Sequence, residues 1–203
     1  MQIDIFADPI CPWCYIGKRR LERALAQRKI DNARIRWRVY QIDPDMPECG
    51  ISRNAYLESK FGGAAQARKF YNAIARVGKS EGIAFDFGRI DQVPNTTQAH
   101  RLIRFALDTP HLDALIETLF RRYLVEGGCI GRIEDLIELA AESGLDRADV
   151  ARHMECGAND IGQQYKAARR LGVQNAPFFI VNKQYALSGV QEPEAFYPLF
   201  DLA

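Results

Sequence analysis

The stretch Asp8-Pro9-Ile10-Cys11-Pro12-Trp13-Cys14 decides how the fold of this chain is interpreted, because its two cysteines lie two residues apart. The preceding residues 2–7 alternate between apolar and polar side chains, which predicts a β-strand. Residues 13–29 form a charged amphipathic segment, which predicts a helix. A CxxC sequence between a strand and a helix is typical of a redox-active dithiol.

The rest of the chain divides into a long helical block with strands on either side. Beyond the first strand and helix, the expected elements are a strand over 34–40, a helical block over 52–171, strands over 177–181 and 185–187, and a helix over 193–202. Within the last helix, Pro198 is expected to disturb the hydrogen bonding.

This order of elements predicts the fold class. Without the helical block, the sequence of strand, helix, strand, strand, strand, helix is that of a thioredoxin fold. We therefore expect an α/β protein with a thioredoxin-like fold and a large inserted all-α domain. Residues 1–48 and 172–203 would form the thioredoxin-like domain, and residues 49–171 the inserted helical domain.

Composition excludes several other classes of protein. The chain has 203 residues, an apolar fraction of 47% and a net charge of +1, which fits a globular protein with its own core. A charge this small does not indicate a nucleic acid or an anionic membrane surface as partner. The sequence has no apolar run long enough for a membrane span and no leader at its N-terminus. We therefore expect a cytoplasmic protein.

The five cysteines are Cys11, Cys14, Cys49, Cys129 and Cys156. An odd number in a cytoplasmic chain argues against a framework of structural disulfides. The three cysteines outside the CxxC sequence are expected to be buried or semi-buried and to behave as small hydrophobic side chains. Cys49 and Cys129 could form a second redox pair, although their separation in the sequence says nothing about contact.

The position of Cys11 favours thiol–disulfide exchange. Cys11 would lie at the N-terminus of the first helix, where unpaired N–H groups and the helix dipole stabilise a thiolate. Pro12 suits the first helical position, and Pro12 and Trp13 would tune the site. Cys14 lies one turn further on, within reach of a disulfide. Cys11 is therefore the expected nucleophile and Cys14 the resolving cysteine.

Two simpler interpretations compete with this one. A structural zinc site needs four ligands, usually from two such cysteine pairs, whereas this chain has one CxxC and few histidines. We therefore expect no metal site. The second alternative is a pair of inert thiols. The bulky Trp13, with its polar N–H, would be unusual between two cysteines that were merely buried in a turn.

The second informative position is Ala176-Pro177, at the start of an apolar strand. Proline is tolerated at the start of a strand. Thioredoxin-like proteins place a cis-proline loop against the CxxC, where the preceding residue offers its backbone to an extended substrate. We therefore expect a cis bond before Pro177, and substrate binding by Ala176, Pro177 and Phe178.

Motifs spread along nearly the whole chain carry a family resemblance. They are CPWCYIGK at 11–18, DPDMP at 43–47, YLESKFG at 56–62, NTTQAHRL at 95–102, APFFIV at 176–181 and ALSGVQ at 186–191. With these motifs the chain resembles the DsbA family of thiol–disulfide oxidoreductases, and in particular its FrnE-like branch. The resemblance implies the inserted thioredoxin fold, the two cysteine roles and the cis-proline. Ala176 and Val190 depart from it, since Val and Ala are expected there.

Three further residues are candidates for supporting the dithiol. His100, in the helix after Asn95, could stabilise the thiolate or transfer a proton, or could simply pack in the helix. Asn95 is expected to cap that helix, with Gln98 three residues on as in a capping box. Lys18 could add positive charge near the thiols, although Lys18-Arg19-Arg20 is also expected to be the solvated face of the first helix.

The sequence thus favours an enzyme, a thiol–disulfide oxidoreductase or isomerase that acts on a protein or a small-molecule disulfide or thiol. It predicts no cofactor beyond the Cys11–Cys14 disulfide itself, with glutathione as a candidate partner, and either a monomer or a homodimer. The alternative is a glutathione-dependent isomerase or transferase of the kappa or 2-hydroxychromene-2-carboxylate isomerase type, which resembles this architecture but has serine in place of Cys11. A third alternative is a chaperone-like binding module, whose client binding would not need the cysteines.

Overall fold

The computed structural model describes residues 1–156 and 160–203. The chain divides into a sheet unit, residues 1–42 and 160–203, and a helical unit, residues 43–159. Residues 160–171, which the sequence analysis assigns to the insertion, belong to the sheet unit because α8 (Ile161–Arg170) packs against β2 (Arg34–Val39). The exact domain boundaries stay a prediction.

A four-stranded sheet in the order β2-β1-β5-β6 is the centre of the sheet unit. Beside β2, its strands are β1 (Gln2–Ala7), β5 (Phe178–Val181) and β6 (Tyr185–Ser188). β1 pairs with β2 in parallel, whereas the β1–β5 and β5–β6 pairs are antiparallel. This sheet with its inserted helical region confirms the predicted α/β, thioredoxin-like fold.

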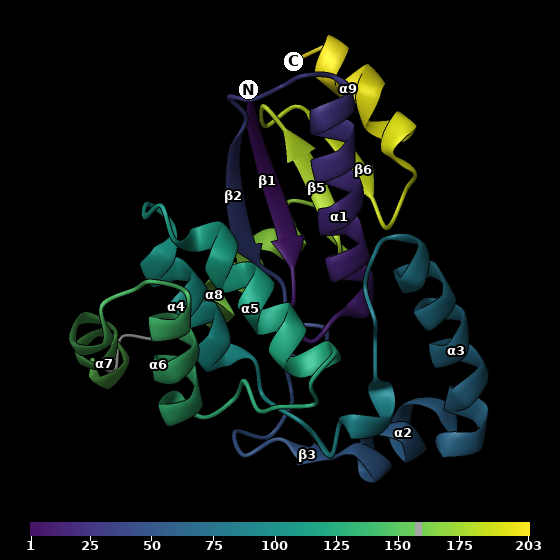
Figure 1. The fold of residues 1–203 in the computed structure, drawn as a ribbon, viewed down its shortest axis with the longest axis vertical. Coiled ribbons are helices and arrows are strands. Elements are labelled where there is room, and N and C mark those ends of the chain that lie inside the picture. Colours follow the sequence, from purple (N-terminus) through teal and green to yellow (C-terminus); the bar gives the residue numbers. More distant parts are fainter. Residues whose placement is uncertain (157–159) are drawn as a thin grey trace. The chain divides into compact units, whose positions relative to one another are not determined.

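Helices cover both faces of the sheet because the apolar side chains of β5 alternate between them. Phe179 is completely buried and lies on the side of α1 (Pro12–Gln27), whose Gly17 approaches the Phe179 ring. Phe178 and Ile180 pack on the opposite side, in a cluster with Phe6, Tyr40, Ala168 and Val173. Figure 1 shows α1 beside the sheet and the two chain termini at the same end of this unit.

The C-terminal segment closes the sheet unit. It forms η2 (Pro193–Phe196) followed by α9 (Tyr197–Asp201). The helix expected over 193–202 is thus divided into a 3₁₀ and an α segment just before Pro198, which lies in the first turn of α9, where its missing N–H is not needed. The Tyr197 hydroxyl donates a hydrogen bond to Gln27 Oε1 at 2.6 Å, which ties α9 to the end of α1.

The helical unit contains the predicted helices and one short strand pair. Its helices are α2 (Arg53–Phe61), α3 (Ala64–Ser80), η1 (Phe87–Arg89), α4 (Thr97–Ala106), α5 (Leu112–Leu124), α6 (Ile133–Glu142) and α7 (Arg147–Glu155). The antiparallel pair β3 (Ile51–Ser52) and β4 (Gln92–Val93) was not predicted. Strands of two residues are too short to show a period-two pattern.

The start of α4 differs by one residue from the expected capping box. The N-cap is Thr96, not Asn95, and it makes no side-chain capping bond. Asn95 Oδ1 nevertheless accepts a hydrogen bond from Thr97 N at 2.9 Å, so the Asn95 side chain caps the first N–H of α4 as expected, while Asn95 Nδ2 donates to the Met46 carbonyl. Gln98 accepts from Arg101 instead of reaching back to the cap.

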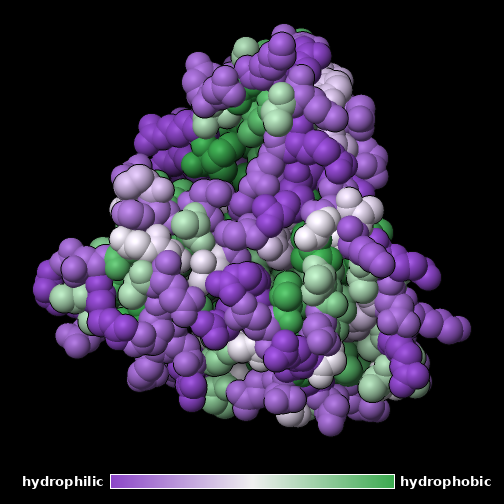
Figure 2. Space-filling model, in the orientation of Figure 1, coloured by the Kyte–Doolittle hydropathy of each residue, from purple (hydrophilic) through white to green (hydrophobic). Residues whose placement is uncertain are grey.

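The surface matches the balanced composition. The face shown in Figure 2 is mostly hydrophilic, with hydrophobic residues in separate patches. None of the helices in the described part of the chain is both long enough and apolar enough to cross a membrane.

Phe179→Ala should lower the free energy of unfolding by about 3–5 kcal/mol, because it leaves a cavity beneath α1. The lost ring also packs edge-on against Phe196, with ring centroids 5.0 Å apart. Urea denaturation measures the change. Leu171→Ala is the control, since Leu171 is 67% exposed and its truncation should change stability by no more than about 0.5 kcal/mol. Equal losses in both variants would contradict this packing.

Candidate active site

Cys11 lies at the N-terminus of α1, as the sequence predicts. It is the N-cap residue, with extended backbone angles, and proline follows in the first turn of the helix. Its own N–H donates to the Asp8 carbonyl at 2.9 Å, and its carbonyl accepts from Cys14 N at 3.0 Å. The Cys11 side chain makes no capping bond, so the sulfur stays available at the end of the helix that favours negative charge.

Cys11 and Cys14 are free thiols that interact with each other. Both are buried, and Cys14 is the less accessible of the two, with 1% of its surface exposed against 5% for Cys11. Burial raises the pKa of the Cys14 thiol well above its ordinary value of 9.0, and the hydrogen bond and charge interaction with Cys11 raise it further. Cys14 is therefore a neutral thiol near neutral pH.

The carboxylate of Asp8 holds the turn that leads into the CxxC sequence. Asp8 is completely buried. Its Oδ1 accepts from Ile10 N at 3.3 Å and its Oδ2 accepts from Ile42 N at 2.7 Å, so it joins the end of β1 to the segment after β2. Asp8 also affects Cys14 through both a backbone hydrogen bond and its charge. A single Asp after a strand gives no signal of burial, so the sequence alone does not identify Asp8 as part of the site.

The Ala176–Pro177 peptide bond is cis, as predicted, and its loop lies beside the dithiol. Cys11 Sγ is 3.9 Å from the carbonyl oxygen of Ala176. The loop continues into β5, where Phe178 pairs with Ser188, and the Pro177 carbonyl accepts from Gly189 N at 2.9 Å. The backbone of Ala176 therefore faces the sulfur of the expected nucleophile. A role of Ala176, Pro177 and Phe178 in substrate binding stays a prediction.

Gly17 allows α1 to approach this loop closely. A Cβ atom at position 17 would lie 2.9 Å from Pro177 Cγ and 3.2 Å from Phe179 Cζ, closer than side-chain atoms normally pack. Glycine within a helix costs about 1 kcal/mol relative to alanine. Because of this cost, an isolated glycine within a helical pattern often indicates close packing. The sequence therefore did contain a signal for the close approach at Gly17.

Tyr40 fixes the segment that precedes the cis-proline. Its hydroxyl donates to the Gln174 carbonyl at 2.7 Å, and its ring lies 5.5 Å from that of Tyr165 on α8. Burial raises the pKa of Tyr40, with a further rise from the charge of Tyr165, so the hydroxyl remains protonated as a donor. The strand pattern did not identify this tyrosine as part of the site.

The basic cluster on α1 is more buried than expected. Lys18 and Arg20 are only 4% and 9% exposed, so they are not a solvated face. Lys18 pairs with Glu22 one turn on, and Arg20 Nη2 lies 2.9 Å from Glu192 Oε1. The alkyl parts of these two side chains are buried in the sheet unit, while their charged ends pair with carboxylates. Trp13 and Pro12 are half-buried.

The remaining candidates lie in the helical unit. His100 is a buried residue of α4, and its expected proximity to the dithiol stays a prediction. Cys49 and Cys156 are exposed, so the expectation of buried or semi-buried thiols is wrong for these two, whereas Cys129 is half-buried as expected. Within residues 1–156 and 160–203, no group of three or more His, Cys, Asp or Glu side chains is arranged to hold a metal ion.

Comparison with known proteins gives the family. A model of the DsbA-like thioredoxin domain matches residues 2–199, which is nearly the whole chain. The chain belongs to the DsbA-like thioredoxin domain family. Its dithiol, cis-proline loop and inserted helical region are thus features of a DsbA-like oxidoreductase fold.

Two solved structures and one further protein sequence are similar to this chain. The crystal structure described as "probable DsbA oxidoreductase SCO1869" from Streptomyces coelicolor is 28% identical, with a TM-score of 0.89 over 100% of this chain and 89% of that one. Cytosolic disulfide reductase DsbM from Pseudomonas aeruginosa with GSH has a TM-score of 0.67 at 18% identity, over 100% of this chain and 98% of that one. Uncharacterized protein YwbO from Bacillus subtilis is 23% identical over 76% of this chain and 72% of that protein.

Gly17→Ala should destabilise the protein by about 1–3 kcal/mol, because the added methyl group forces α1 and the cis-proline loop apart. It should also slow the reaction of Cys11 with a model disulfide. Gly162→Ala in α8 is the matched control, since a Cβ there would meet no atom within 4 Å. Urea denaturation and stopped-flow kinetics measure the two effects. Unchanged stability and kinetics in the Gly17 variant would contradict the close packing.

The raised pKa of Cys14 predicts that the reduced protein loses stability in alkaline solution. In the unfolded chain the Cys14 thiol loses its proton near pH 9.0, whereas in the folded chain it does so only at a higher pH. Below pH 9.0 the thiol is protonated in both states, so its titration does not lower the free energy of unfolding there. Above it, up to the folded-state value, this thiol should cost about 1.4 kcal/mol of stability per pH unit. Urea denaturation of the reduced protein at several pH values measures the loss. A Cys14→Ala variant that loses as much stability would contradict this prediction.

Proposed function

We propose that this chain is a thiol–disulfide oxidoreductase in which Cys11 attacks a substrate disulfide and Cys14 resolves the mixed disulfide. The observation that carries the proposal is the grouping of three elements. The sulfur at the helix N-cap interacts with a second, buried thiol and lies 3.9 Å from the carbonyl of Ala176, beside a cis-proline. Nucleophile, resolving thiol and a backbone edge for the substrate are thus adjacent.

In the first step, Cys11 acts as a thiolate, stabilised by the N-terminal end of α1. Its sulfur forms a bond to one substrate sulfur while the substrate S–S bond breaks. The other substrate sulfur leaves with the electron pair as a thiolate and takes up a proton from solvent. The product is a mixed disulfide between Cys11 and the substrate.

In the second step, Cys14 attacks the Cys11 sulfur and releases the second substrate thiol. The Cys14 proton is lost to solvent, and a Cys11–Cys14 disulfide remains. Part of the rise in the Cys14 pKa comes from Cys11 itself, after the larger effect of burial. That part disappears once Cys11 carries no charge, so formation of the mixed disulfide itself activates Cys14. The same steps in reverse transfer a disulfide to a dithiol substrate.

The substrate would bind along the loop 176–178. Phe178 is already paired with β1 and β6, so the backbone that an extended substrate would meet is that of Ala176, just before the first paired residue of β5. Hydrogen bonding between extended backbones is a common mode of peptide recognition. We therefore assign a protein disulfide or a small-molecule disulfide as substrate, with glutathione as a second partner. The DsbM reductase seen with GSH shares the fold and supports this choice. We also place the chain in the FrnE-like branch, by its motifs, and in the cytoplasm.

Cys11→Ser should abolish insulin reduction in the presence of a thiol reductant, because it removes the sulfur that attacks the protein disulfide in the proposed first step. Cys14→Ser should instead trap that mixed disulfide, which mass spectrometry detects as a covalent adduct on Cys11. Cys156→Ser is the matched control, since it removes an exposed thiol of the helical unit and should retain wild-type activity.

Activity that survives Cys11→Ser would overturn the proposal. Glutathione-dependent turnover of an aromatic substrate by that variant would favour an isomerase or transferase instead, because the serine would then occupy the position where such enzymes hold the glutathione thiolate.

A further inference from the structure

The small net charge of the chain hides a separation of charge between its two units. The sheet unit has thirteen Lys and Arg residues against eight Asp and Glu residues, which is a net charge of +5. The helical unit has fourteen Lys and Arg residues against eighteen Asp and Glu residues, which is a net charge of −4. A net positive charge attracts anionic ligands and speeds their association. The sheet unit, which contains the dithiol, therefore favours an acidic substrate.

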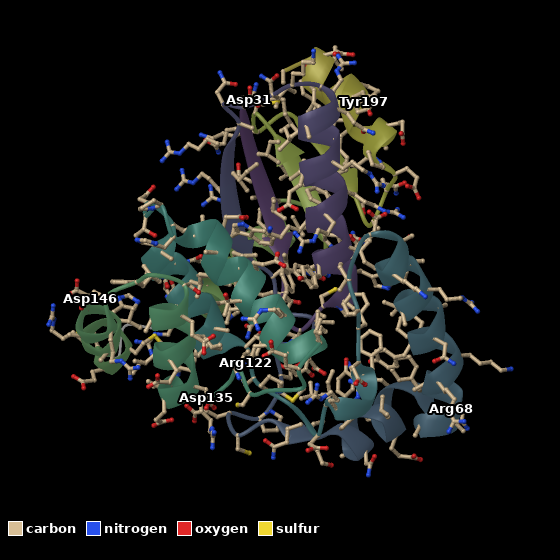
Figure 3. All side chains as sticks on the ribbon, in the orientation of Figure 1. Asp31, Arg68, Arg122, Asp135, Asp146 and Tyr197 are labelled. Carbon is tan, nitrogen blue, oxygen red and sulfur yellow. The ribbon has the colours of Figure 1, made fainter. Side chains whose placement is uncertain are left out.

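Two cations at the end of α8 take no part in the ion pairs of this unit. Among residues 1–156 and 160–203, the ion pairs of the sheet unit have as their cations Lys18, Arg19, Arg20, Arg23, Arg28 and Arg38. Arg169 and Arg170 are not among them, and both are exposed in the last turn of α8. Figure 3 labels Asp31, a carboxylate of the same unit that precedes β2 and lies at the other end of that strand from Tyr40.

Arg169 differs from Arg170 because it is held beside the segment that leads to the cis-proline. Its Nη1 donates to the Val173 carbonyl at 3.2 Å. Its guanidinium also forms a hydrogen bond with the side chain of Tyr40, whose hydroxyl donates to the Gln174 carbonyl at 2.7 Å. A guanidinium has five N–H donors. These contacts therefore orient the Arg169 side chain and leave it donors for a ligand.

The same contacts bring this guanidinium near the reacting sulfur. The charges of Arg169 and Cys11 both act on Tyr40, so both groups lie within electrostatic range of one hydroxyl. Val173 and Ala176 are three residues apart, which is at most about 11 Å of extended chain, and the Ala176 carbonyl lies 3.9 Å from Cys11 Sγ. An extended substrate advances about 3.3 Å per residue. An acidic side chain two residues from the substrate cysteine therefore falls within this span.

We propose that Arg169 determines substrate specificity by binding a carboxylate two residues from the reacting cysteine of a protein disulfide. This role rests on the proposed function of Cys11 and Cys14, and it defines the substrate class as extended, acidic protein segments. The carboxylate accepts hydrogen bonds from those N–H groups of Arg169 that are not bonded to Val173 or Tyr40. Arg169 holds the substrate along the loop while the sulfur atoms exchange, and it transfers no proton itself.

The test uses two symmetrical peptide disulfides that differ only two positions on each side of the cysteine, where one has Glu and the other Gln. The reduced full-length protein is mixed with each peptide, and stopped-flow kinetics give the ratio of the two rate constants, acidic over neutral. In Arg169→Gln this ratio should fall about fivefold, the effect of losing one exposed charge pair. Arg170→Gln is the matched control and should keep the wild-type ratio, since Arg170 is exposed in the same turn but is not the residue bonded to Val173. High salt should lower the wild-type ratio by screening the charge pair.

The same ratio in the wild-type protein and in Arg169→Gln would overturn the proposal. Such a result includes an equal loss of rate on both peptides, because Arg169 would then only hold the loop. An equal fall of the ratio in Arg170→Gln would also overturn it and assign the preference to the general charge of the sheet unit. A wild-type protein that reduces neither peptide contradicts the proposed function itself, whereas reduction of both peptides with an unchanged ratio leaves that function intact.

Discussion

The close packing of α1 against the cis-proline loop is the constraint on which the site depends. Only glycine at position 17 lets the helix lie against Pro177 and Phe179 without a clash. That contact sets the distance between the start of α1 and the start of β5, and so places Cys11 Sγ beside the Ala176 carbonyl. Phe179, buried below the same contact, fixes the strand in turn. The position of the Cys11 sulfur thus follows from the packing between α1 and β5.

Patterns along the chain were sufficient for those parts of the fold that depend on local sequence. Alternation predicted β1 and β2, a short apolar run predicted β5, and the CxxC sequence followed by an amphipathic segment predicted Cys11 at the start of α1. The cis bond before Pro177 followed from the fold and not from the dipeptide itself. These features need only a few neighbouring residues, or one known architecture, to be recognised.

Features that depend on distant segments could not be predicted in this way. The carboxylate of Asp8 is completely buried and accepts from Ile42 N, in the segment after β2, and the nearly buried Arg20 pairs with Glu192, more than 170 residues further along the chain. Helix α8 joins the sheet unit because its apolar side chains complete the cluster around Tyr40 and Phe178. In each case the interacting residues lie far apart in the sequence. No local pattern of residues therefore predicts the contact.

The two thiols of the CxxC sequence differ in their physical setting. Cys11 lies at the N-cap of α1 beside the Ala176 carbonyl, whereas Cys14 is more deeply buried, with 1% of its surface exposed against 5% for Cys11. Burial is the largest cause of the raised pKa of Cys14. The order of attack that we propose, Cys11 first and Cys14 second, rests on this difference.

The most direct test is the redox equilibrium of the Cys11–Cys14 pair. The protein is equilibrated with glutathione buffers of increasing oxidised fraction, quenched with an alkylating reagent and mapped by mass spectrometry. The account predicts that Cys11 and Cys14 lose reactivity together, in one two-electron step, as their disulfide forms. If the two thiols remain alkylated independently at every ratio, or Cys11 collects only a glutathione adduct that Cys14 never displaces, the account is contradicted.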